Sequence, residues 1–253
     1  MTNTKAVFAA TLEDIKQADD LSFMAGVTHA ILHGFNNSPP SVGVPGWVRF
    51  GTWFSEHNPW WPLLPRWVAY NGRLSWALRQ GQQVVPVAIL GPTCEVWSRS
   101  GLDRAAFVNH PPWLHLLWQA MQQAGAAADY LSESVVAQAR AEGGQWRCGP
   151  VSYELLVVVG ARRLPPALAE HLSELVAQGC RLVMVEPLPD RAVALQDCAA
   201  GDQRVQEAVR RLLAHGPVQV RQLAPPPWDG LLAWVDQLLN LTAVTRSVRF
   251  DAL

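Results

Sequence analysis

A short polar segment after the apolar run at residues 27–32 is the first place where the sequence could bind a polar ligand. It contains His33 and Asn36, whose side chains can both donate and accept hydrogen bonds. Residues just after the carboxyl end of a strand often contact ligands in β/α folds. The same side chains could instead satisfy the backbone of the loop locally. Both interpretations place His33 and Asn36 at the end of a buried strand.

A second segment, at residues 56–61, combines ionisable and aromatic side chains. Glu56 could act as an acid or base on a substrate, although a lone Glu-His pair such as Glu56 and His57 is more often a solvated surface. Trp60 and Trp61 offer aromatic faces that can stack on a flat apolar face of a ligand. Because adjacent residues point in different directions, we expect one tryptophan of the pair to belong to the core.

A helix, a strand and a second helix must position these two segments. Thr11 is a suitable N-cap with Asp14 three residues later, a variant of the capping box, and Gly26 can end the helix. The spacing of apolar residues predicts the helix, the strand and the second helix over residues 11–26, 27–32 and 61–81. A buried strand needs neighbours, and the sequence indicates no other strand before residue 84. The first eighty residues therefore look like the end of a larger β/α array.

From residue 82 onward, predicted strands alternate with predicted helices. The continuously apolar run at 153–160 is typical of a strand buried on both faces of a parallel sheet. The strands are predicted over residues 84–90, 153–160, 181–187 and 218–223, and the helices over residues 111–125, 165–179, 202–216 and 228–241. This alternation predicts an α/β fold with a parallel sheet and helices on both faces. We divide the chain into residues 1–81, 82–225 and 226–253, the last being a helix and tail.

Composition and charge argue against several classes of partner. The 253 residues carry a formal net charge of −1 and show no basic stripe, which argues against nucleic acid and anionic membranes. No apolar stretch approaches the roughly 20 residues of a membrane span, and the N-terminus is a poor signal peptide, so the chain as written is expected to be cytoplasmic. The four cysteines lack a C-x-x-C spacing, and we expect no metal and no cofactor.

Several motifs occur in an order that indicates a family. They are His33-Gly34-Phe35, Ser38-Pro39, Asn58-Pro59-Trp60-Trp61, and Tyr70 with Arg73. The later segments are DYLSESVV, SYELLVVVGARRLPP and GCRLVMVEPLP. This series, over about residues 8–225, resembles large glycoside hydrolases of the α-L-rhamnosidase type, family 106 and its relatives. Asn37 departs from the pattern, because the family has an aromatic residue there.

The resemblance implies both a fold and an activity. Residues 1–81 would be the C-terminal part of a (β/α)8 barrel, and residues 82–225 a flavodoxin- or glutamine-amidotransferase-like domain. The complete enzyme would hydrolyse terminal deoxy-sugar linkages of the α-L-rhamnoside type with two carboxylates on strands upstream of Met1. We therefore expect this chain to be inactive alone and assign it no catalytic residue. The carbohydrate would contact His33, Asn36, Glu56, His57, Trp60 and Trp61.

The alternative function is a non-catalytic α/β scaffold or interaction module. Its exposed barrel edge would bind a complementing partner chain or cause self-association. An amidotransferase activity is not indicated, because the strand at 181–187 ends in Glu186-Pro187 and Cys180 precedes that strand. The two arginines of VVVGARRLPP are interpreted as part of a solvated loop. Further carboxylates without an assigned role are Glu95, Asp103 and Glu133.

Overall fold

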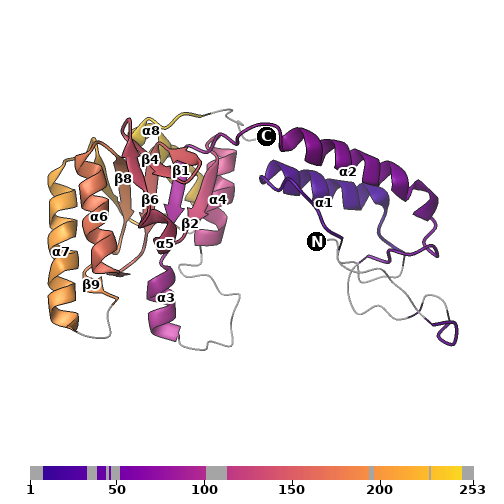
Figure 1. Cartoon of the computed structure of the whole chain (residues 1–253), viewed down its shortest axis with the longest axis horizontal. Coiled ribbons are helices and arrows are strands. Elements are labelled where there is room, and N and C mark those ends of the chain that lie inside the picture. Colours follow the sequence, from indigo (N-terminus) through magenta and orange to yellow (C-terminus); the bar gives the residue numbers. More distant parts are fainter. Residues whose placement is uncertain are drawn as a thin grey trace. The chain divides into compact units, whose positions relative to one another are not determined.

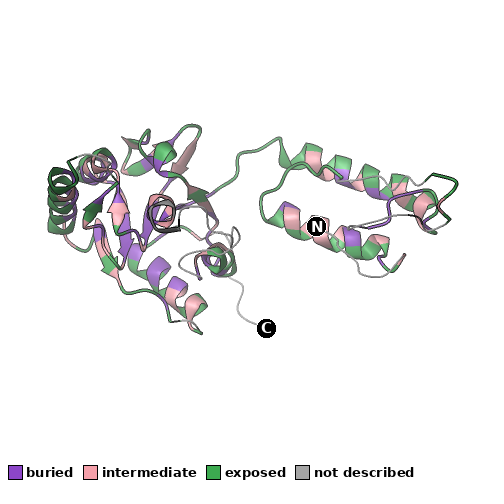
Figure 2. Ribbon diagram, turned by 90° about the horizontal axis from the view of Figure 1, so that it is seen from below, coloured by how far each residue is buried: buried purple, intermediate pink, exposed green. Residues whose placement is uncertain are grey.

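The chain consists of two compact units, residues 1–83 and 84–253, each with its own helices (Figure 1). The computed structural model describes residues 8–32, 39–43, 46, 52–100, 113–193, 197–227 and 229–246. Buried residues line the strands of the second unit and the sides of the helices that pack on them (Figure 2). The two units are therefore described separately.

The first unit contains two long helices, α1 (Leu12–Met24) and α2 (Leu64–Leu78), with the 3₁₀ helix η1 (Trp61–Leu63) directly before α2. The predicted capping box at the start of α1 is confirmed. The Thr11 hydroxyl accepts from the Asp14 N–H at 3.1 Å, and Asp14 accepts from the Thr11 N–H at 2.8 Å. Gly26 follows the C-cap with φ +91°, a conformation that glycine adopts without strain.

A small aromatic core joins α1 to the segment before α2. Ile15, Phe54 and Trp67 are buried together, with Trp60 and Trp61 packed partly against them. The polar edge of this contact is ordered by a carboxylate of α1. Asp19 accepts hydrogen bonds from Trp67 Nε1 at 2.8 Å and from Asn71 Nδ2 at 3.1 Å.

The strand predicted at residues 27–32 is not formed. These residues have no regular secondary structure and are exposed, with Ile31 at 84%. A strand of this apolar type is stable only when neighbouring strands satisfy its backbone and cover its side chains. No strand of the described part of the first unit is available to do so, and the prediction is therefore wrong for this structure.

The second unit is built on a five-stranded parallel sheet, which confirms the predicted α/β class. Its strands are β1 (Val87–Leu90), β2 (Ala128–Leu131), β6 (Leu155–Val159), β8 (Arg181–Val185) and β10 (Val220–Leu223), in the order β10-β8-β6-β1-β2. In sequence order this is 2-1-3-4-5 when read from the β2 edge, the order of flavodoxin-like sheets. The central strand β6 is buried along its whole length, because helices cover both faces.

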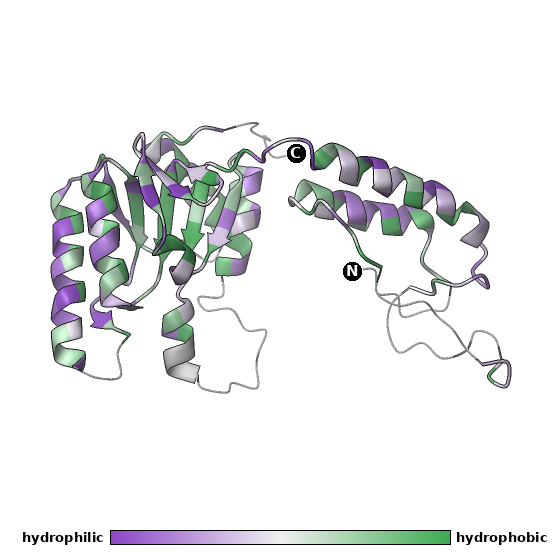
Figure 3. Ribbon diagram, in the orientation of Figure 1, coloured by the Kyte–Doolittle hydropathy of each residue, from purple (hydrophilic) through white to green (hydrophobic). Residues whose placement is uncertain are grey.

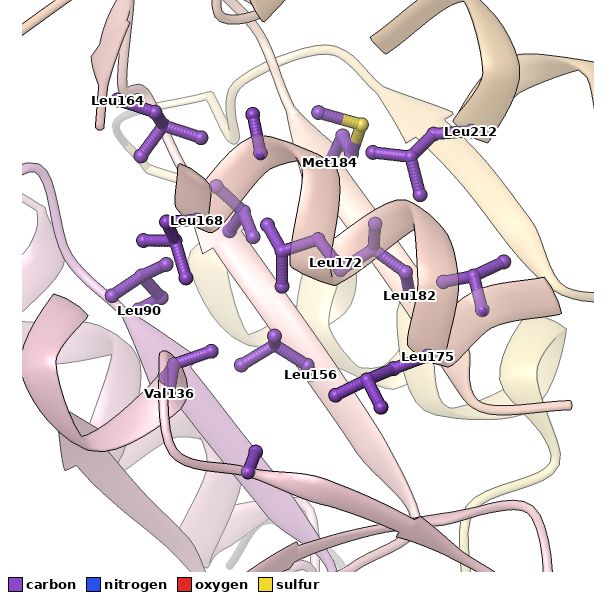
Figure 4. Packing of buried hydrophobic residues seen from close by; sticks show 14 of the residues in the cluster. Leu90, Val136, Leu156, Leu164, Leu168, Leu172, Leu175, Leu182, Met184 and Leu212 are labelled. Carbon is purple, nitrogen blue, oxygen red and sulfur yellow. The ribbon is translucent and has the colours of Figure 1, made fainter. Parts of the chain in front are cut away.

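The helices of the second unit form one layer on each face of the sheet. The helices α4 (Leu114–Gln123) and α8 (Leu231–Thr242) share one apolar core with the sheet, so residues 231–242 belong to this unit. On the other face, α5 (Glu133–Val136), α6 (Pro166–Ala177) and α7 (Cys198–Ala214) form the second core with the sheet (Figure 4). Hydrophobic residues are concentrated in the strands, whereas α7 carries many hydrophilic ones (Figure 3).

Short elements between the main strands were not predicted from the sequence. Directly after β1 comes α3 (Thr93–Ser100). A three-stranded antiparallel sheet comprises β3 (Arg140–Glu142), β4 (Gln145–Cys148) and β5 (Val151–Tyr153). The two-residue strands β7 (Arg163–Leu164) and β9 (Arg191–Ala192) pair in parallel. Among the described residues, none of the helices combines the length and apolar character needed to cross a membrane.

Candidate functional site

A tight turn in the first unit presents the predicted ligand-binding residues Glu56 and His57. The Asn58 N–H donates to the Ser55 carbonyl at 3.0 Å and closes the turn. The buried side chain of Asn58 then holds it in place, because its Nδ2 donates to the Trp53 carbonyl at 3.0 Å. Both sides of the turn are therefore anchored in the core of the unit.

Glu56 and His57 occupy the tip of this turn and are exposed. Their neighbours Ser55 and Asn58 are buried, so the backbone that carries the two ionisable side chains is fixed while the side chains remain accessible. This arrangement suits contact with a polar ligand that approaches from outside the unit. Whether Glu56 and His57 contact substrate stays a prediction.

Trp60 and Trp61 pack partly against the aromatic core, and neither is completely buried. The Trp60 indole N–H donates to the Ala10 carbonyl at 2.8 Å, and its ring meets Phe54 edge-on with centroids 5.7 Å apart. Trp60 thus ties the start of α1 to the segment before α2. Because neither residue is completely buried, this segment could offer an aromatic face to a ligand.

His33 and Asn36 lie outside the described residues, as does Asp103. The other four predicted ligand-binding residues, Glu56, His57, Trp60 and Trp61, lie in one described segment of six residues because they are close in the sequence. Within the described parts of the chain, no group of three or more His, Cys, Asp or Glu side chains is arranged to hold a metal ion.

The acidic residues of the first unit are concentrated on α1 and have structural partners there. Asp14 completes the capping box, and Asp19 accepts from Trp67 and Asn71. Asp20 accepts from Tyr70 OH at 2.6 Å and pairs with Lys16 at 2.5 Å. The remaining acids of residues 1–83 are Glu13, in the first turn of α1, and Glu56. Glu56 is therefore the carboxylate of this unit that lies on a loop.

The capping box makes the stability of α1 depend on pH. Hydrogen bonds from the Thr11 backbone N–H and then the Thr11 hydroxyl lower the pKa of Asp14 below its ordinary value. A carboxylate with a lowered folded-state pKa stabilises the fold above its unfolded-state pKa, and this contribution is lost as pH falls through the folded-state pKa. We expect acidification from pH 7 to below about 4 to increase hydrogen exchange in α1, after correction for intrinsic exchange rates. In the Asp14→Asn variant, the α1 amides should be less protected against exchange at pH 7, and they should lose less protection on acidification. Equal losses in both proteins would contradict this assignment.

The cysteines near the parallel sheet are not activated as nucleophiles. Burial, followed by the neighbouring Glu133, raises the pKa of the Cys94 thiol to about 11. Burial likewise raises the pKa of Cys180 to about 11, and this residue precedes β8. Catalytic thiols require the opposite shift, so these two residues give no support to amidotransferase chemistry.

The interpretation of Arg162 and Arg163 as a solvated loop missed a pocket in the second unit. The pocket has a volume of about 380 Å³ and is lined by both arginines together with Glu95, Arg191 and Asp202. The feature of the sequence that could have indicated this pocket is the pair of arginines directly after a buried strand. Their convergence with Arg191 depends on the pairing of β7 with β9, which sequence patterns did not indicate.

The comparison with protein families agrees with the motif series. A model of glycoside hydrolase family 106, described as alpha-L-rhamnosidase, matches residues 1–225. The search of curated proteins found no significant match. One similar solved structure is Gan42B, a GH42 beta-galactosidase, with 16% sequence identity and a TM-score of 0.30. The match covers 47% of this chain and 17% of that enzyme, so the chain spans a small part of its length.

Proposed function

The chain belongs to glycoside hydrolase family 106, and from this membership we propose that it is part of a glycosidase that cleaves terminal deoxy-sugar linkages of the α-L-rhamnoside type. The observation that carries the proposal is the family match, which extends over residues 1–225 and therefore includes the first unit and most of the second. In this proposal the first unit is the C-terminal part of a (β/α)8 barrel. The second unit is an amidotransferase-like α/β domain with a structural role.

The distribution of carboxylates supports a catalytic site that needs residues beyond the first unit. Glycosidases of the common type use two carboxylates that flank the scissile bond. Asp14, Asp19 and Asp20 have structural partners in or beside α1, and Glu13 lies in the first turn of that helix. Glu56 alone remains on a loop of residues 1–83. We infer that the catalytic pair is provided by further barrel strands and that the isolated chain is inactive.

The exposed apolar segment at residues 27–32 supports the same conclusion from packing. Val27, Ile31 and Leu32 are all exposed, although the short apolar run to which they belong is typical of a buried strand. Neighbouring parallel strands would pair the backbone of this segment and remove its apolar side chains from water. We therefore propose that residues 27–32 become a barrel strand when the neighbouring strands are present.

In the completed barrel, the predicted site residues would surround the sugar. His33 and Asn36 would contact sugar hydroxyls from the end of the strand. Trp60 and Trp61 would offer an aromatic face to the apolar side of a deoxy sugar. Glu56 and His57 would reach the sugar from the fixed turn described above.

A second candidate function is a non-catalytic scaffold, favoured by the same exposed segment. An unpaired apolar segment can associate with another chain or with a second copy. The two functions predict different activities once neighbouring strands cover the segment. The scaffold would remain inactive, whereas the glycosidase would gain activity.

Hydrolysis of a chromogenic α-L-rhamnoside distinguishes the two functions. We expect none from the chain alone, and hydrolysis when the chain is produced together with the preceding β/α units of a family 106 enzyme. In that complete enzyme, Glu56→Gln should lower kcat/KM about tenfold, the cost of one hydrogen bond of ~1.4 kcal/mol. Glu13→Gln is the matched control and should leave kcat/KM unchanged.

Three results would contradict parts of this proposal. Hydrolysis by the chain alone would show that the catalytic pair lies within it. A folded, completed enzyme that does not cleave the rhamnoside would reject the glycosidase and favour the scaffold. Equal effects of Glu56→Gln and Glu13→Gln would remove Glu56 from the substrate contacts.

A further inference from the structure

The polar pocket of the second unit lies outside the carboxyl ends of three adjacent strands. Glu95 follows β1, Arg162 and Arg163 follow β6, and Arg191 and Asp202 follow β8. These strands are neighbours in the sheet order β8-β6-β1. The connection after β1 passes through α4 on one face, and the connection after β6 passes through α6 on the other. The pocket is therefore at the topological switch point, where open parallel sheets bind ligands.

The arginines of this pocket retain donors that their carboxylate partners do not use. Arg162 donates Nε and Nη2 to Asp190, which leaves Nη1. Arg191 donates Nη1 to Asp202 at 2.9 Å, which leaves Nε and Nη2. Additional acceptors in the pocket could bind these remaining donors without breaking either pair.

Of the three arginines, Arg163 has the most hydrogen-bond donors that remain unused. Arg163 forms an ion pair with Glu95, whose Oε2 lies 3.8 Å from Arg163 Nε, too far for a hydrogen bond, and it also interacts electrostatically with Asp202. The Arg163 side chain is 42% exposed, whereas the Glu95 carboxylate is buried. An arginine fork in this state can bind a planar carboxylate with two parallel hydrogen bonds.

The charges around the pocket limit the charge of its ligand. Arg162, Arg163 and Arg191 are opposed by three carboxylates, those of Asp190, Glu95 and Asp202. The N-terminal end of the 17-residue helix α7 adds a partial positive charge, because Cys198 lines the pocket. This partial charge of roughly half an elementary charge offsets part of one added negative charge, whereas a dianion would leave a larger excess of negative charge.

The size and remaining chemistry of the pocket complete the description of the ligand. A volume of about 380 Å³ is near the lower end for ligand pockets and suits one small molecule. Asp202 accepts from the Ala192 N–H at 2.7 Å and from Arg191, and its oxygens keep lone pairs for further donors. Five of the seven lining residues are charged, so the ligand should be polar.

We propose that this pocket binds a small hydroxylated monocarboxylate, with the carboxylate on the Arg163 guanidinium and hydroxyl groups donating to Asp202. The site is separate from the proposed glycosidase activity, because all of its residues belong to the second unit. The alternative is that the arginines form only a salt-bridge network that holds β9 and α7 to the loop after β6.

Calorimetric titration of the full chain tests the proposal with D-gluconate and L-lactate as hydroxylated monocarboxylates. D-glucose serves as a polyol without a carboxylate, and inorganic phosphate as a different oxyanion. We expect saturable binding of at least one hydroxy acid, at least tenfold weaker binding in Arg163→Gln, and no binding of glucose. Arg204→Gln removes another arginine that pairs with a carboxylate, Glu170, outside the pocket, and should bind as the wild type does.

Several outcomes would overturn the proposal. Absence of binding by both hydroxy acids would leave the arginines as a salt-bridge network. Equal weakening in the Arg163→Gln and Arg204→Gln variants would show a nonspecific charge effect. Tighter binding of phosphate than of either hydroxy acid would reject the ligand class. Because Arg163 is partly exposed and donates no hydrogen bond to the described residues, its replacement by glutamine should not prevent folding.

Discussion

Replacing Leu172 by alanine is expected to lower the free energy of unfolding of the second unit by about 2–5 kcal/mol. Leu172 is 0% exposed and projects from α6 toward the sheet, among Leu156, Leu168 and Leu182 (Figure 4). The substitution removes buried methyl groups and leaves a cavity that close-packed neighbours fill only in part. Hydrogen exchange of the β6 and β8 amides measures this decrease in the stability of the second unit directly.

The matched control is the same substitution at Leu213 on α7. This side chain is 39% exposed, so its removal leaves little cavity, and we expect a cost below about 1 kcal/mol. Similar losses for the two variants would show that the core between α6 and the sheet is not packed as described. Because the chain has two units, a single unfolding curve is a poor substitute for local exchange data.

Asp19→Ala should destabilise the contact between α1 and α2 by about 1.5–3 kcal/mol, the range for hydrogen bonds to a charged group. The substitution removes the acceptor of Trp67 Nε1 and of Asn71 Nδ2, and both of these side chains are buried. Each donor would then lie away from water without a partner. Protection of the α1 and α2 amides against hydrogen exchange should fall together.

Two further variants make this prediction specific. Asp19→Asn keeps one acceptor oxygen. The protection of its α1 and α2 amides should therefore lie between that of the wild type and that of Asp19→Ala. Gln17→Ala changes an exposed residue of the same helix and should alter protection by less than about 0.5 kcal/mol. A fall in protection as large for Gln17→Ala as for Asp19→Ala would mean that general helix stability, rather than the Asp19 contacts, holds α1 to α2.

Features that depend on nearby residues could be predicted from the sequence. Thr11 and Asp14 form the capping box because their partners are three residues apart. The continuous apolar run around β6 identified a strand buried on both faces, and the prolines and glycines around α6 marked its ends. The predicted strands at 84–90, 181–187 and 218–223 likewise contain β1, β8 and β10.

Features that depend on distant partners could not be predicted in the same way. Residues 27–32 have the pattern of a buried strand, yet the described part of their unit offers no strand to pair with them. The strand β2 was missed because its burial varies along its length and it lies at an edge of the sheet. Apolar periodicity is a weak signal for such short edge elements, and it says nothing about their neighbours.

The two candidate sites also differ in how much of each could be predicted from the sequence. The segment with Glu56, His57, Trp60 and Trp61 could be selected by residue type because its members are adjacent, and the motif series around it indicated the family that the comparison shows. The packing of Trp60 on Phe54 and the convergence of Arg163 with Arg191 required the folded chain. Local sequence determines caps and buried strands, because their interactions reach a few residues. Only the tertiary structure decides which loops meet at the end of a sheet, because strand order brings together residues far apart in the chain.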